Sequence, residues 1–86
     1  MIASVVATLD PDAALRSHLQ TELAARPELE VGDWSPTMTR IPITIDVQNR
    51  HQMEDSTTWL RTQPGVLMVD VVFVYFEDEV NSKPRT

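Results

Sequence analysis

Four segments of the chain have the hydrophobic pattern of β-strands. Residues 2–9 form a short, partly β-branched apolar run, and residues 29–34 form a weaker strand candidate that contains Gly32. Residues 40–48 alternate between apolar and polar positions, which is typical of a strand with one buried face. Residues 66–76 are apolar at every position except Asp70. This last segment is the strongest strand candidate.

Two helices are predicted between these strands. Leucines recur every fourth residue from Leu15 to Leu23, and residues 10–12 (Asp-Pro-Asp) supply an N-cap carboxylate followed by Pro at the first helical position. Asn49 and Gln52 have the spacing of a capping box, and the Pro-Gly pair at residues 64–65 ends the helix that follows. Met53, Thr57 and Leu60 are expected to form the inner face of this second helix.

The element order is therefore strand, helix, strand, strand, helix, strand. A βαββαβ chain of this length predicts an α+β fold, the ferredoxin-like sandwich, with a four-stranded antiparallel sheet and both helices on one face. With 86 residues, the chain is expected to hold one such domain over residues 1–79. Residues 80–86 are predicted to be a flexible polar tail.

The sheet face away from the helices, here called the open face, is the most informative predicted surface. Residue parity assigns the two faces, with polar side chains marking the open one. The buried face is predicted to contain Val5, Leu9, Ile41, Ile43, Ile45, Leu67, Val69, Val71 and Phe73, packed on Leu15, Leu19 and Leu23. The open face is predicted to contain Ser4, Val6, Thr8, Thr44, Asp46, Met68, Asp70, Val72 and Val74.

An apolar patch with a polar rim suggests a surface for a partner. Two alternatives remain open at this point. The patch is also explained by a homodimer interface, or by the general suitability of valine for strands. The sequence does not separate a heterologous partner from self-association.

Composition and charge exclude several functions. The net charge of −6 argues against nucleic-acid binding, which depends on Lys and Arg neutralising phosphates. The chain has no cysteine, so thiolate metal sites and iron–sulfur clusters are excluded, and with only two glycines it has no Gly-rich phosphate loop. The first residues contain no basic segment and a short apolar run, so we predict neither a signal peptide nor membrane insertion.

The candidates for catalysis are weak. His18 is expected to be a partly buried structural residue beside the leucines, and His51 a solvated one, with no metal-ligand spacing between them. Asp46 and Asp70 share the predicted open face, where a pair of carboxylates could do acid–base chemistry, but nothing encloses them. We therefore predict no enzyme activity, no metal and no cofactor. Trp34 and Trp59 suit either a lid on the core or a binding surface.

A family resemblance appears in the last third of the chain. Residues 56–72 read STTWLRTQPGVLMVDVV and resemble the helix, PGVL turn and hydrophobic strand of the NapD family. Residues 4–6, 30–31, 43–46 and 76–78 resemble other strands of that family, so that the similarity covers residues 2–79. The chain departs from the family at residues 72–75, where Val-Phe-Val-Tyr replaces the common Val-Tyr-His. A Gly expected before the third strand is also missing.

This resemblance implies a function. NapD-type proteins are cytoplasmic chaperones that bind the twin-arginine signal peptide of the periplasmic nitrate reductase and hold back its export until the molybdenum cofactor is loaded. By this resemblance, Val6, Met68, Val72 and Val74 would contact the apolar part of the peptide, with Ser4, Thr8 and Thr44 beside them. Asp46, Asp70 and the acidic cluster that begins at Glu77 would attract its arginines. The alternative is an ACT-like regulatory domain that binds a small ligand as a homodimer.

Overall fold

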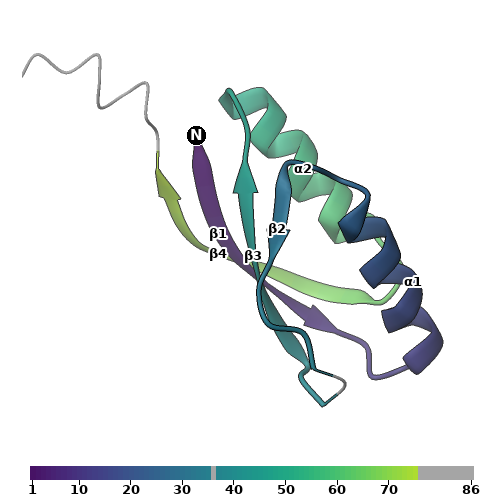
Figure 1. Ribbon diagram of the computed structural model, residues 1–86. Coiled ribbons are helices and arrows are strands. Elements are labelled where there is room, and N and C mark those ends of the chain that lie inside the picture. Colours follow the sequence, from purple (N-terminus) through teal and green to yellow (C-terminus); the bar gives the residue numbers. More distant parts are fainter. Residues whose placement is uncertain (36, 76–86) are drawn as a thin grey trace, which may run out of the picture.

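The computed structural model describes residues 1–35 and 37–75. Its elements are β1 (Ile2–Leu9), α1 (Ala13–Ala24), β2 (Leu29–Val31), β3 (Arg40–Asp46), α2 (Arg50–Thr62) and β4 (Val66–Tyr75). The strands form one sheet in the order β2-β3-β1-β4, and every neighbouring pair is antiparallel. Both helices lie on one side of this sheet (Figure 1). The predicted ferredoxin-like fold is confirmed.

The core lies between the helices and the two central strands. Alternate residues of β1 and β3 point into it, and the intervening residues are partly or fully exposed. Ile41, Ile43 and Ile45 are at most 2% exposed, and burying each such side chain contributes about 1.5–3 kcal/mol. The other buried apolar residues are Ala3, Val5, Ala7, Leu9, Leu19, Leu23, Leu29, Met53, Leu60 and Val69.

Helix α1 begins two residues later than the sequence suggested. Its N-cap is Asp12, whose Oδ1 accepts a hydrogen bond from the backbone N–H of Leu15 at 3.0 Å. The carboxylate of Asp10 instead accepts from the backbone N–H of Asp12 at 2.8 Å, which forms a turn before the helix. The prediction of Asp10 as the cap was wrong because both aspartates can accept locally, and Pro11 stands outside the helix.

The inner face of α1 includes an arginine in place of the predicted histidine. His18 is exposed, whereas Arg16 is buried, so the expectation of a partly buried His18 was wrong. Arg16 donates from Nη2 to the carbonyl oxygen of Ser35 at 2.9 Å, and its guanidinium carbon lies 5.7 Å from the centre of the Trp34 ring. The hydrogen bond and the cation–π contact offset the free-energy cost of burying the charge.

Helix α2 begins at the predicted cap. The Asn49 side chain accepts from the backbone N–H of Gln52 at 2.9 Å, and the Gln52 side chain in turn accepts from the backbone N–H of Gln48 at 2.9 Å. In a capping box the second bond goes to the backbone N–H of the cap residue itself. Here it goes to the N–H of Gln48, the residue before the cap. Gly65 follows the helix with a φ of +93°, a conformation that glycine adopts without steric cost. Within the described residues, no helix is long and apolar enough to cross a membrane.

Candidate functional site

The two central strands bring the predicted polar positions of the open face together. In the register of β1 and β3, Ser4 lies opposite Thr44, and Ile2 lies opposite Asp46. The next open-face positions of β1 are Val6 and Thr8. All five residues that the sequence assigned to this half of the open face therefore lie on it. Ile2 shares their parity and extends the surface by one apolar side chain, so the sequence contained the signal for it.

Strand β4 follows the prediction only over its first half. Met68 lies opposite Thr8, and Asp70 lies opposite Val6, so both belong to the open face as predicted. The register then shifts between Ser4 and Val5, whose partners are Phe73 and Val71, and this leaves Val72 as an inserted residue. The insertion is a β-bulge, which reverses the alternation of every residue after it.

The bulge places two aromatic residues on the open face and turns Val74 toward the core. Phe73 lies opposite Ser4 and Tyr75 lies opposite Ile2, which places both aromatic side chains on the open face. Val74 lies opposite the buried Ala3 and packs partly against the core, and Val72 has no partner on β1. The predictions of Val74 on the open face and of Phe73 in the core were therefore wrong, whereas the register assigns the exposed Val72 to neither face.

Two further residues of β4 were assigned to the core and are exposed. Leu67 is 64% exposed, and a second register irregularity leaves it without a partner between Thr8 and Leu9. Val71 lies opposite the buried Val5 but is 47% exposed. Strand β4 forms one edge of the sheet and curves along its length (Figure 1), so that the core does not cover it as it covers β1.

The open face as the structure has it is an apolar surface bordered by charges. Its apolar side chains follow β1 and β4, and its charged ones lie mainly on the side of β2 and β3. The apolar members are Ile2, Val6, Met68, Phe73 and Tyr75. The charged members are Glu30, Arg40, Asp46 and Asp70, with Ser4, Thr8, Pro42 and Thr44 completing the surface.

The charges on the open face are not equivalent. The Nη2 atom of Arg40 lies 3.5 Å from Oδ2 of Asp70, so that this ion pair passes over β1 from one neighbouring strand to the other. Among the described residues, the carboxylates of Glu30 and Asp46 have no ion pair. Glu77, which the sequence assigned to the site, lies outside the described residues. Three carboxylates against one guanidinium make this surface acidic.

The open face does not have the geometry of a carboxylate pair for catalysis. Asp46 lies in the row of Ile2, and Asp70 lies in the row of Val6, four residues further along β1. Four residues of a strand span about 13 Å, which is too far for two carboxylates to act on one bond. The described residues also contain no group of three or more acidic or histidine side chains that could hold a metal ion.

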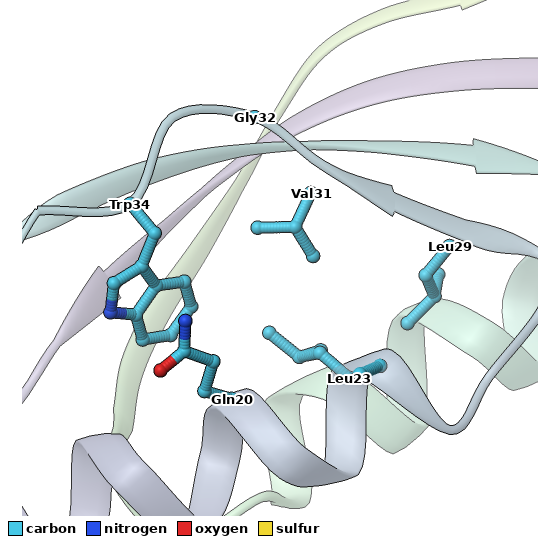
Figure 2. A pocket seen from close by; sticks show the side chains of 7 residues that line it. Gln20, Leu23, Leu29, Val31, Gly32 and Trp34 are labelled. Carbon is cyan, nitrogen blue, oxygen red and sulfur yellow. The ribbon is translucent and has the colours of Figure 1, made fainter.

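A hollow on the other side of the sheet lies between α1, β2 and the chain that follows β2 (Figure 2). It has a volume of about 300 Å³ and is lined mainly by apolar side chains, with Gln20 and Trp34 as its polar groups. Trp34 and Trp59 are both partly buried against the core, and each ring has an arginine over it. For Trp59 this is Arg26, with its guanidinium carbon 4.2 Å from the ring centre. Both tryptophans therefore serve packing on the helix side, away from the open face.

Two comparisons with known proteins find matches that cover nearly all of this chain. The family model described as NapD protein matches residues 1–78. The fold is similar to the solution structure of the E. coli Tat proofreading chaperone protein NapD, with a TM-score of 0.73 and 21% sequence identity. That match covers 100% of this chain and 88% of the other. The comparison with curated proteins finds no match.

Proposed function

Because this chain belongs to the NapD family, a family of chaperones and not of enzymes, we propose that its open face binds a twin-arginine signal peptide. The peptide would belong to the catalytic subunit of a periplasmic nitrate reductase or a related molybdoenzyme. Binding in the cytoplasm would hold back export of this subunit until its cofactor is loaded. The observation that carries the proposal is an exposed apolar surface with unpaired carboxylates along one side.

The apolar side chains suit the hydrophobic stretch of such a peptide. Met68 and Phe73 are each more than half exposed, and Ile2 and Tyr75 are about 40% exposed. In the register of β1 and β4 these side chains follow one another from the row of Ile2 to the row of Thr8, with Val6 and Asp70 near the middle. An amphipathic helix laid across these side chains would bury apolar area on both partners.

The carboxylates suit the two arginines. Glu30 lies opposite Thr44, and Asp46 lies two residues further along β3, opposite Ile2. An arginine guanidinium forms bidentate hydrogen bonds with a carboxylate, and these bonds fix its orientation as well as its position. The net charge of −6 would also accelerate the encounter with a cationic peptide.

Calorimetric titration with a twin-arginine signal peptide of a periplasmic nitrate reductase tests the proposal. The control peptide has both arginines replaced by lysine, which keeps the charge and removes the bidentate geometry. We expect a micromolar or tighter Kd for the arginine peptide and weaker binding of the lysine peptide. If a folded sample releases no heat with the arginine peptide, even at high concentration, the proposal is wrong.

A pair of variants locates the binding site. Asp46→Asn removes an open-face carboxylate and should weaken binding, with a smaller dependence on salt. Asp55→Asn, an exposed position on α2, makes the same change of net charge on the helix side of the sheet. Equal effects of the two variants would show that only the overall charge matters and would exclude Asp46 as a contact.

Self-association through β4 is the second candidate for the same region. Six of the large apolar side chains that are exposed among the described residues belong to this edge strand: Leu67, Met68, Val71, Val72, Phe73 and Tyr75. An edge strand with a single charged residue offers little protection against pairing with a second copy. Light scattering on the free protein and on its peptide complex separates the two candidates, because a homodimer would persist without any peptide.

A further inference from the structure

The open face has two different ends. Asp46 stands at one end of β3 and Arg40 at the other, six residues away. Six residues of a strand span about 20 Å. Glu30, which is paired with Thr44 in the sheet, lies near the Asp46 end. One end of the surface is therefore acidic, and the other carries its single arginine.

Asp70 does not add a third free carboxylate to this surface. Arg40 lies opposite Thr8, and Asp70 lies opposite Val6, so the arginine side chain crosses β1 to reach the carboxylate. Their closest atoms are 3.5 Å apart, and the two side chains are 61% and 46% exposed. This exposed pair is weak, yet it places a positive charge where the sequence alone predicts an uncompensated negative one.

We propose that Arg40 determines the direction in which a cationic peptide lies on the open face. This inference rests on the proposed function. The cationic end of the peptide lies over Asp46 and Glu30, and its apolar stretch follows β1 and β4 toward Met68. The reverse orientation would place two guanidinium groups beside Arg40, where they meet a like charge and must compete with it for Asp70.

The apolar positions are compatible with this direction. Val6 lies between the acidic end and Arg40, in the row of Asp70, and Met68 lies in the row of Thr8 and Arg40 at the far end. A peptide that begins over Asp46 therefore passes over apolar side chains as it runs along the face. The aliphatic part of the Arg40 side chain can pack against the apolar stretch even though its charge repels a cation.

The test uses a twin-arginine signal peptide that carries a nitroxide spin label beside its arginines. Amide signals of the ¹⁵N-labelled protein broaden when they lie close to the label. We expect the strongest broadening at Thr44 and Asp46 of the wild-type protein, with clearly weaker broadening at Thr8 and Met68. Arg40→Glu makes both ends of the surface acidic, and we expect the broadening to spread to Thr8 and Met68.

Two further variants complete the design. Arg40→Gln removes the competing cation without adding an acid and should tighten peptide binding about twofold to fivefold, as for the loss of an exposed ion pair. Arg61→Glu, on the exposed side of α2, changes the net charge as Arg40→Glu does. We expect this matched control to leave the broadening pattern of the wild type unchanged.

The outcomes separate this inference from the function on which it rests. A wild-type protein that does not bind the peptide overturns the proposed function and the inference with it. A peptide that binds with its label next to Thr8 and Met68 overturns the direction alone. A pattern that stays at Thr44 and Asp46 in Arg40→Glu shows that Arg40 does not set the direction.

Discussion

Replacing Phe73 by alanine tests the β-bulge through its effect on binding. The bulge places Phe73 on the open face, whereas uninterrupted alternation along β4 would bury it and present Val72 instead. Alanine at position 73 should therefore weaken binding of the twin-arginine peptide. Alanine at position 72 should leave it almost unchanged, because Val72 has no place in the register opposite β1.

The expected magnitude follows from the exposed area. A phenylalanine side chain offers roughly 200 Å², and Phe73 is 55% exposed, so that about 110 Å² remains for a ligand. At about 25 cal/mol per Å², covering all of this area contributes about 2.7 kcal/mol, and covering half of it about 1.4 kcal/mol. The Kd of Phe73→Ala should rise about 10- to 100-fold. Val72→Ala should change the Kd about twofold at most, as for other exposed substitutions.

Calorimetric titration of the wild type and both variants with the same peptide measures the two effects. Urea unfolding of each variant confirms that the comparison is made between folded proteins, and Phe73→Leu keeps apolar bulk at the position if the alanine variant is unstable. A larger loss of affinity in Val72→Ala than in Phe73→Ala would refute the reasoning. It would mean that β4 alternates regularly in solution and that the aromatic side chains do not belong to the binding surface.

Three further substitutions test the elements that support the open face. Leu60→Ala removes a fully buried side chain of α2 and should lower the free energy of unfolding by about 2–5 kcal/mol in urea titration; a change below that range would contradict the packing of this helix. Gly65→Ala combines a φ of +93° with a new Cβ only 3.2 Å from Cβ of Leu15. It should cost about 1–2 kcal/mol, which thermal unfolding would reveal as a lower Tm, while an unchanged Tm would argue against the left-handed turn. Asn49→Ala removes the α2 cap and should cost about 1 kcal/mol, with Asn49→Gly milder; equal losses in the two variants would exclude capping as the cause.

The sequence predicted the fold because the contrast between apolar and polar positions is strong where the fold is decided. Residues 40–46 alternate without exception, and the buried isoleucines of β3 lie where that alternation places them. The cap at Asn49 was also predictable, since its partner stands three residues away. The cap of α1 was not, because Asp10 and Asp12 are equally good acceptors and their local bonds decide between them.

The arrangement of the open face along β4 could not be predicted from the sequence, again because the alternatives look equally good at the level of residue type. Residues 71–75 are apolar or aromatic at both parities, so nothing in their pattern marks where an inserted residue reverses the faces. The contact of Arg40 with Asp70 was equally hidden, because it depends on the register of three strands. Residue parity assigned the open face correctly along β1 and β3, where tight packing leaves one register.

The central position of β1 has a consequence for how the chain folds. Its two neighbours are β3 and β4, and Ile2 lies opposite Tyr75, at the far end of the described sequence. Because β1 precedes both neighbours in the chain, it cannot complete its ladders until β4 has been made. Contacts between residues so distant along the chain slow folding. During synthesis β1 can pair with β3 first, but its other edge stays unpaired until β4 has been made, so this small domain completes its sheet only after most of its length is available.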